Sequence, residues 1–435
     1  MRMNVRIGSD DFIFIHPETQ GEFDAIAALN GRVHGEGVAV LARVLRDGAP
    51  GMGPEDWYGL FDPSGERCLS TLCRIPATWS LNAGRDGGPA CELPVAELGL
   101  VATDEGARGG GLSSWLMKRF LADSKERGYL LSSIQGIPYF YRRFGYEYAV
   151  PLLMGVRLSP ELTAGLGTPP SHRPASAEDL PLLKAWFDES QRPLELRAER
   201  DDPRWAFLTG EAQKSPETAV ERLVLLDESG APAGYLGVQN DCFGPTLAVV
   251  EGWQGGIAPE AALALAEKLR AERGLPHVTS FLDRGHPVSA AAQALGGELW
   301  DGYGWQMSAL DPPAFMAAAA PVYASRLKDG GFSGVPARLA LDFYGSSCLL
   351  SWDGEALLVG RHGRDYPVGE PIETADHGDT PEARVPPELL APLALGFRRR
   401  DEIACLRFDL GVPKASRSFF DAIFKPARGF VYPLY

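Results

Sequence analysis

The stretch from Val95 to Val150 constrains the fold more than any other part of the chain. It begins with an apolar run over Val95 to Val101, which has the length of a β-strand, and continues into the turn Arg108-Gly109-Gly110-Gly111-Leu112-Ser113. Apolar residues at 112, 115, 116 and 120 then repeat at helical spacing. Gly128 is typical of a helix C-cap, and Leu130 to Ile134 has the length of another strand. The stretch therefore predicts strand, glycine turn, helix and strand, in that order.

The glycine turn is typical of an anion-binding site. Consecutive glycines let backbone N–H groups approach a ligand closely, and a helix N-terminus adds unsatisfied donors and a positive dipole end. A tight turn without a ligand is the alternative interpretation. No Lys-Ser/Thr pair follows the glycines, which excludes a phosphate loop of the NTPase kind. The dinucleotide fingerprint, with its spaced glycines and later acid, is also absent.

The pattern that fits is Arg-x-x-Gly-x-Gly/Ala, represented here by Arg108, Gly111 and Ser113. Together with the preceding GLVAT and the later FYRRFGYEYA, the segment resembles the GNAT superfamily of acetyl-CoA-dependent N-acetyltransferases. Ser113 replaces a small apolar residue of the family pattern, and one or two extra residues lie within Thr103 to Ala107. The resemblance implies that acetyl-CoA is the co-substrate and that a primary amine is the acceptor.

The chain has 435 residues, which is enough for two or three domains. A second helical run, Pro259 to Arg273, ends Glu-Arg-Gly as the first does at Glu126-Arg127-Gly128, and a short apolar strand follows each run. This repetition indicates an internal copy. The loop of the copy, GWQGGIAPE, lacks the Arg-x-x-Gly-x-Gly/Ala pattern. We therefore interpret the copy as an acetyltransferase fold without a cofactor site.

The pattern changes again from about Leu310. An Ala-rich helix is predicted over Pro312 to Leu327, followed by three strands between Val335 and Val359 and a helix over Glu388 to Gly396. This order is similar to the sterol-carrier-protein-like domain that closes one subgroup of acetyltransferases, and the whole chain resembles the enhanced-intracellular-survival (Eis) enzymes. The resemblance implies a homo-oligomer, such as a hexamer.

The predicted fold class is α/β (α+β), with two tandem GNAT-fold domains followed by a sterol-carrier-protein-like α+β domain. Residues 1–150 would form the catalytic domain, 151–309 the degenerate GNAT-like domain, and 310–435 the last domain. In the first domain, Met1 to Ile15 is predicted as one alternating strand, and Phe23 to Val33 and Val38 to Leu45 as two helices. His34 and Glu36 between these helices could face a substrate, although a solvated loop is the more common environment.

The resemblance also implies which residues hold acetyl-CoA. Backbone N–H groups of the glycine turn would bind the diphosphate. The main chain before it would pair with the pantetheine arm and point an N–H at the thioester carbonyl. The predicted cofactor-binding residues are Gly99, Leu100, Val101, Arg108, Gly109, Gly110, Gly111, Leu112, Ser113, Ser114, Gly136 and Ile137.

Two further residues are candidates for the chemistry. Tyr141 matches the acid of the family at the first tyrosine of Y-x-R-F-G-Y, and a phenol stays protonated at neutral pH and can donate to a leaving thiolate. Tyr139 is the alternative. In Eis-like enzymes the C-terminal carboxylate enters the active site, which here would be that of Tyr435. The aromatic, apolar end GFVYPLY favours burial of this tail, with packing alone as the alternative role.

Composition narrows the remaining possibilities. The net charge of −15 argues against a nucleic-acid partner and would attract cationic amines, with solubility alone as the alternative role of the charge. Six scattered cysteines and the absence of a signal-peptide pattern indicate free thiols in the cytoplasm. No apolar run reaches the ~20 residues of a membrane span, and no histidines fall at metal-ligand spacing. A lipid- or ligand-binding carrier and an interaction scaffold are the alternative functions.

Overall fold

A computed structural model describes the chain except residues 83–87, 153–154, 243, 301, 362–379 and 433–435. The chain divides into two compact units. Unit 1 contains residues 1–150, 195–215 and 305–435, and unit 2 contains residues 151–194 and 216–304. One piece of chain from the middle of the sequence, residues 195–215, therefore belongs to the unit that holds both the glycine turn and the last third of the chain.

A large, mostly antiparallel sheet forms the centre of unit 1, with the strand order β1-β2-β3-β4-β5-β6-β16-β7, while β10 pairs with β4. In the described part of this sheet β5 and β6 run parallel, and the helix α3 connects them. The strands are β1 (Arg2–Ile7), β2 (Asp10–Ile15), β3 (Trp57–Phe61), β4 (Cys68–Asn82), β5 (Ala90–Thr103), β6 (Leu131–Ile134), β7 (Glu147–Leu152), β10 (Leu196–Ala198) and β16 (Tyr303–Ala309).

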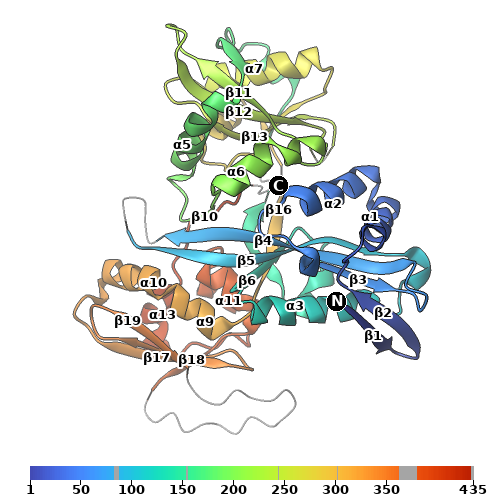
Figure 1. Cartoon of the computed structure of the whole chain (residues 1–435). Coiled ribbons are helices and arrows are strands. Elements are labelled where there is room, and N and C mark those ends of the chain that lie inside the picture. Colours follow the sequence, from blue (N-terminus) through green and yellow to red (C-terminus); the bar gives the residue numbers. More distant parts are fainter. Residues whose placement is uncertain (83–87, 153–154, 243, 301, 362–379, 433–435) are drawn as a thin grey trace. The chain divides into compact units, whose positions relative to one another are not determined.

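Helices cover both faces of this sheet (Figure 1). On one face lie α1 (Gln20–His34) and α2 (Glu36–Gly48), and a buried apolar cluster that includes Phe23, Ile26 and Trp57 fills the space beneath them. On the other face α3 (Leu112–Glu126) packs through a second cluster that includes Leu116 and Phe120. A capping box at Thr19 fixes the start of α1, since Thr19 accepts from the Glu22 N–H and the Glu22 carboxylate accepts from the Thr19 N–H.

Unit 2 has its own sheet, ordered β15-β8-β14-β13-β12-β11-β9. Here, too, two parallel strands, β13 and β14, are joined through a helix, α7. The strands are β8 (Val156–Leu158), β9 (His172–Pro174), β11 (Glu221–Leu226), β12 (Pro232–Asn240), β13 (Leu247–Trp253), β14 (Val278–Ser280) and β15 (Glu298–Leu299). The helices are α4 (Pro160–Thr163), α5 (Leu180–Gln191), α7 (Pro259–Glu272) and α8 (Pro287–Ala294), while α6 (Asp202–Thr209) belongs to unit 1.

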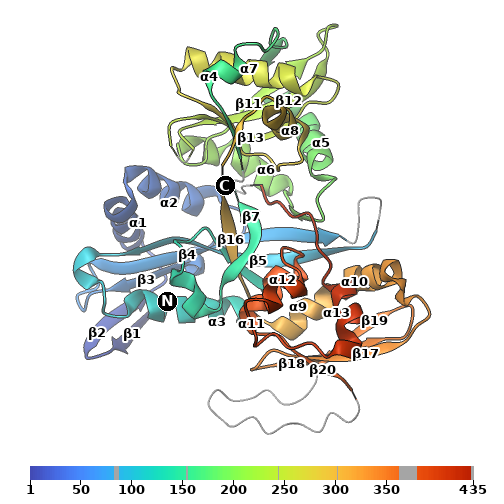
Figure 2. The same cartoon turned by 180° about the vertical axis from the view of Figure 1, so that it is seen from behind.

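The C-terminal segment of unit 1 contains a four-stranded sheet with the order β19-β18-β17-β20, and helices lie beside it (Figure 2). Its helices α9 and α10 also contact β5, so the C-terminal segment packs against the central sheet of its own unit. The elements are α9 (Pro312–Ala318), α10 (Ala320–Leu327), β17 (Ala337–Asp342), β18 (Ser347–Trp352), β19 (Leu357–Arg361), β20 (Glu382–Arg384), α11 (Pro387–Ala394), α12 (Arg400–Ala404) and α13 (Arg417–Ile423).

The mixed α and β architecture agrees with the predicted fold class. Three local predictions were wrong. Met1 to Ile15 is a hairpin, because Gly8 adopts a left-handed conformation (φ +64°) and reverses the chain. The helices α1 and α2 meet at Gly35 alone, so His34 ends the first and Glu36 begins the second. The Ala-rich helix divides at Ala319, two residues before Pro321. The boundaries of the three domains stay a prediction.

Candidate active site

The strands β5 and β6 are neighbours over only part of their length. Parallel pairing joins Val95–Glu97 of β5 to Leu131–Ser133 of β6 and then stops, although β5 continues for six more residues to Thr103. The segment of β5 from Leu98 onward therefore has no partner strand on the β6 side among the described residues. Because no strand pairs with this edge of β5, an extended ligand can pair with it.

A β-bulge lies at the point where β5 leaves β6. Cys73 pairs with Gly99 and Thr71 with Ala102, so that Leu72 alone faces the two residues Leu100 and Val101. Leu100 has φ +50°, a left-handed conformation that is uncommon for a leucine and costs on the order of 1 kcal/mol. Gly99 is tightly enclosed, because a Cβ atom there would lie 2.7 Å from Cδ1 of Ile75. The bulge turns backbone groups of the predicted thioester-binding residues out of the regular sheet pattern.

The glycine turn joins β5 to α3 and presents backbone donors. Gly109 and Gly111 have φ of +84° and +80°, which only glycine adopts readily. Gly111 is the N-cap of α3 and has no side-chain cap, and the first turn contains no acidic residue. The first helical hydrogen bond runs from the Trp115 N–H to the Gly111 carbonyl, which leaves the preceding N–H groups from Leu112 to Ser114 without a backbone partner in the helix. These donors and the helix dipole suit an anionic ligand.

The end of α1 abuts the same part of β5. Nε2 of His34 lies 3.0 Å from the Val101 carbonyl oxygen, so Nε2 carries the proton and donates. Two residues earlier, Arg32 forms an ion pair with Asp104, the residue that follows β5. The Arg108 Nε–H donates to the Thr103 carbonyl at 3.4 Å. The sequence offered His34 as a residue that could face a substrate from a solvated loop and gave no role to Arg32, because the approach of both to β5 depends on helix packing.

The four tyrosines of residues 139–148 have different environments. Tyr139 is 78% exposed with φ +70°. Tyr146 is fully buried, and its hydroxyl donates to Oγ of Ser132 at 2.7 Å, because Ser132 itself donates to the Ala96 carbonyl. Tyr148 is half-buried. Tyr141, in the 3-10 turn Phe140–Phe144, is 5% exposed, and its hydroxyl forms no hydrogen bond with the residues that the structure describes.

Burial raises the pKa of Tyr141 to about 12, so its hydroxyl is protonated at neutral pH. The ring lies directly against Gly136, where a Cβ atom would come within 2.2 Å of Cε2 of Tyr141. Glycine at 136 thus allows the ring of Tyr141 to lie at the end of β6, beside the separation of the two strands. Of the two tyrosines considered from the sequence, Tyr141 is the one placed inside the fold.

Comparison with known proteins assigns a family to this part of the chain. Residues 15–149 match the family model described as acetyltransferase (GNAT) domain. Residues 15–149 form a GNAT acetyltransferase domain. No curated protein is detectably similar to the chain in sequence.

Solved structures extend the likeness in fold to the whole chain. A probable N-acyltransferase from Enterococcus faecalis V583 has a TM-score of 0.66 at 16% identity, with 100% of both chains covered. A GCN5-related N-acetyltransferase from Anabaena variabilis has a TM-score of 0.67 at 14% identity, covering 97% of this chain and 99% of its own. Eis1 from Mycobacterium abscessus has a TM-score of 0.60 at 15% identity, covering 97% and 100%. The chain therefore contains a GNAT acetyltransferase domain and shares the fold of these structures, and GNAT acetyltransferases use acetyl-CoA.

A residue from far along the chain completes the acetyltransferase domain. The strand β16 adds to β6 in antiparallel register, with Gln306 opposite Ile134. The Gln306 side chain, 1% exposed, donates from Nε2 to the Gly136 carbonyl at 2.8 Å and lies 3.4 Å from the Ile137 carbonyl oxygen. The two predicted cofactor-binding residues after β6 are therefore held by a residue 170 positions away. Nothing in the sequence motif of the domain signals this contact.

The tail also joins the central sheet of unit 1. The Phe430 N–H donates to the Leu196 carbonyl at 3.1 Å, and β10, which contains Leu196, pairs with β4, the neighbour of β5. Phe430, Val431 and Tyr432 are all buried, as the apolar sequence of the tail predicted. Tyr435, the predicted base, lies outside the described residues.

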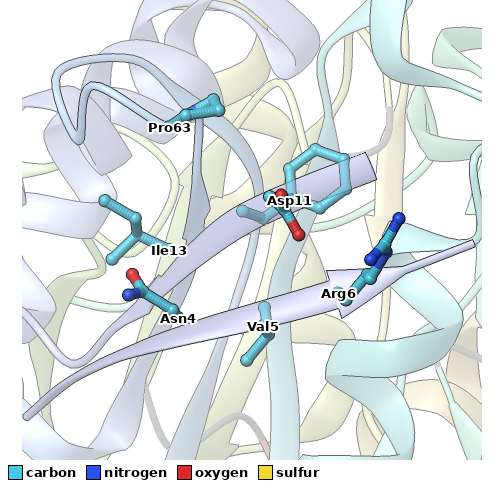
Figure 3. A pocket seen from close by; sticks show the side chains of 7 residues that line it. Asn4, Val5, Arg6, Asp11, Ile13 and Pro63 are labelled. Atoms are coloured by element: carbon cyan, nitrogen blue, oxygen red, sulfur yellow. The ribbon is translucent and has the colours of Figure 1, made fainter. Parts of the chain in front are cut away.

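Two hollows of unit 1 contain none of the predicted site residues. One, of about 430 Å³, lies on the β1–β2 hairpin between Asn4, Arg6 and Asp11 on the strands and Pro63 opposite them (Figure 3). The other, of about 510 Å³, includes Tyr129 and Arg204. Over the described part of the chain, no group of His, Cys, Asp and Glu side chains could hold a metal, and no helix has the length and apolarity to span a membrane.

Proposed function

We propose that the chain transfers an acetyl group from acetyl-CoA directly to a primary amine of a cationic small molecule or a lysine side chain. The observation that carries the proposal is the separation of β5 from β6 at the bulge, directly before an uncapped, glycine-rich helix N-terminus. An extended thioester arm fits against free strand backbone, and its diphosphate fits against free N–H groups. These are two chemically different parts of acetyl-CoA.

The main chain of Gly99 to Val101 would pair with the pantetheine amides and donate an N–H to the thioester carbonyl. The backbone of Gly109 to Ser114 would hold the diphosphate, with Arg108 beside it. Gly136 and Ile137 would line the other side of the arm, in the position that Gln306 stabilises. This assignment uses backbone groups almost throughout, so it depends on geometry more than on side-chain identity.

The chemistry requires two proton transfers. The amine nitrogen attacks the thioester carbonyl carbon, the new C–N bond forms, and the C–S bond breaks to release the CoA thiolate. We assign Tyr141 as the proton donor to that thiolate, since burial keeps its phenol neutral. A reference thiol titrates near 8.5, so full transfer from a phenol with a pKa of about 12 is uphill in water. The phenol therefore acts first as a hydrogen-bond donor to the developing negative charge on sulfur.

The proton leaving the amine needs an acceptor, and we assign the C-terminal carboxylate of Tyr435 to this role. The burial of Phe430 to Tyr432 beside β10 and the likeness to Eis-type enzymes support this assignment. A free carboxylate has a reference pKa near 3.5 and is a weak base, so a bridging water or burial would have to assist it. Its negative charge would also favour a cationic acceptor.

We further propose the three-domain organisation of the Eis-type enzymes: a catalytic GNAT domain over 1–150, a degenerate copy over 151–309, and a sterol-carrier-like domain over 310–435. The likeness in fold to Eis1 over nearly the whole chain supports this proposal. Within unit 2, the parallel strands β13 and β14 joined through α7 repeat the arrangement of β5, α3 and β6. A homo-oligomer, such as a hexamer, belongs to the same proposal.

Acetyl transfer can be tested without knowing the acceptor. The full chain, saturated with acetyl-CoA, is incubated with a panel of aminoglycosides, polyamines and lysine peptides, and free thiol and acetylated product are measured. The expected result is stoichiometric release of CoA with at least one amine. Absence of turnover with every amine, together with binding of lipids to the C-terminal region, would instead favour the carrier function.

A further inference from the structure

Three arginines from separate elements meet at the turn that follows β5. Arg67 precedes β4, Arg32 lies in the last turn of α1, and Arg108 begins the glycine turn. Nη2 of Arg67 lies 2.8 Å from Oδ1 of Asp104, and Nη2 of Arg32 lies 3.5 Å from its Oδ2. We call Arg32, Arg67 and Arg108 the arginine rim. All three belong to unit 1, and they lie at the base of the turn, while the free N–H groups lie at its far end.

The arginine rim has hydrogen-bonding capacity that the protein does not use. Each guanidinium carries five N–H donors. Among the described residues, Arg32 and Arg67 each reach Asp104 through one nitrogen, and Arg108 donates only from Nε to the Thr103 carbonyl. Asp104 is largely covered at 13% exposure, whereas the side chains of Arg32 and Arg67 are 52% and 59% exposed. The unused donors therefore face water.

The charge of this region contrasts with that of the whole chain. The protein has a net charge of −15, yet the turn gathers three arginines against the two acids Asp104 and Glu105. Exposed ion pairs contribute little to stability, typically about 0–1 kcal/mol, so stabilising the turn is a weak reason for two of them on one carboxylate. A cationic patch in an acidic protein concentrates an anionic ligand locally.

We propose that the arginine rim binds the 3′-phosphate of the CoA nucleotide and makes the enzyme selective for CoA over its 3′-dephospho form. This inference rests on the proposed function, in which the glycine turn holds the diphosphate. The nucleotide end of CoA continues from the diphosphate and carries a phosphomonoester with about −1.5 to −2 charge, the form with which a guanidinium pairs in two parallel hydrogen bonds. Asp104 holds two of the arginines in place while leaving most of their donors available.

The test compares two ligands and two variants by calorimetry on the full chain. CoA and 3′-dephospho-CoA are titrated into the natural protein, into Arg67→Gln and into Arg43→Gln. Arg43 is the matched control, since it lies on α2 away from the glycine turn, is similarly exposed and forms one ion pair at 3.6 Å, with Glu36. The natural protein should bind CoA at least about tenfold more tightly than 3′-dephospho-CoA. Arg67→Gln should lose most of that difference by weakening CoA alone, whereas Arg43→Gln should keep it.

Two results would overturn the inference. The first is equal affinity of the natural protein for both ligands. The second is an equal loss of affinity for both ligands in Arg67→Gln at unchanged melting temperature, which would place Arg67 on the diphosphate or give it a purely structural role. If Arg67→Gln does not fold, Arg32→Gln serves as the second variant with the same expectation. If the natural protein binds neither ligand, the proposed function itself is wrong, so the two failures are distinguishable.

Discussion

The glycine turn of unit 1 and the loop before α7 in unit 2 have the same place in the order of strands and helices, but they differ in the backbone donors and charges that they present. In both units a strand leads through a loop into a helix and then into a parallel strand. In unit 1 the helix begins after left-handed Gly111 with its first N–H groups uncapped. In unit 2 the helix α7 begins with Pro259, which has no N–H, follows Ala258, and has Glu260 in its first turn.

Several of the remaining donors of the unit 2 loop are already used. The N–H groups of Ala261 and Ala262 donate to the Ala258 carbonyl, and the Ile257 N–H donates to the Gln254 carbonyl at 2.7 Å. On β13, Glu251 forms a buried ion pair with Arg222. An anion that approaches α7 would meet a carboxylate and donors that are partly used, so we expect acetyl-CoA to bind in unit 1 and not in unit 2.

The largest expected effect follows from placing a carboxylate in the unit 1 loop. Gly111→Glu should abolish acetyl-CoA binding, because it forces a side chain onto φ +80° and sets a negative charge at the helix N-terminus. Gly256→Glu in unit 2 is the control, since a side chain at Gly256 meets open space, and it should leave binding unchanged. Calorimetry should give one site per chain. Two equivalent sites, or loss of binding in Gly256→Glu, would refute the contrast between the two loops.

The next largest effect concerns Tyr141. Tyr141→Phe should lower kcat by roughly 100- to 10,000-fold and leave acetyl-CoA affinity nearly unchanged, because it removes a proton donor but little contact area. Burial raises the pKa of Tyr141 to about 12, so ionisation of its phenol should not reduce the rate until the pH approaches that value. A pH–rate profile of the natural enzyme checks this expectation. Full activity in Tyr141→Phe with loss in Tyr139→Phe would assign the role to Tyr139.

The sequence could predict the parts of this site that are local in the chain. The spacing of Arg108, Gly111 and Ser113 located the turn, because turn geometry depends on neighbouring residues. Tyr141 was chosen by the resemblance of Y-x-R-F-G-Y to the family pattern, and its role stays a prediction. The left-handed conformation of Leu100 had no signal, since leucine seldom adopts it. The contacts of Gln306 and His34 also had none, because a pairing over 170 or 67 positions is decided by tertiary packing.

A smaller loss is expected at the end of the chain. Deleting Tyr435, or appending a C-terminal tag, should lower kcat by roughly 100-fold, at the lower end of general acid–base effects, because water can partly replace a weak base. An N-terminal tag should be harmless. The melting temperature should stay the same, since the buried contacts of Phe430 to Tyr432 remain. If N-tagged, C-tagged and Tyr435-deleted protein transfer acetyl at equal rates, the tail contributes only packing and the base is another residue.

The smallest expected effect concerns the side-chain amide of Gln306 in unit 1, compared with that of Gln293 in unit 2. Gln306→Leu removes the donor to the Gly136 carbonyl, and a neutral hydrogen bond contributes about 1 kcal/mol, or about fivefold in affinity. The KM for acetyl-CoA should rise by about that factor, because Gly136 would line the pantetheine arm and the ring of Tyr141 lies against it. Gln293→Leu in unit 2 is the control, since Gln293 also donates to a carbonyl, that of Arg284, at 3.1 Å. Both variants should lose similar stability, but only Gln306→Leu should change KM. If both change it equally, the effect reports general destabilisation, and Gln306 has no special part in holding the strand end beside Tyr141.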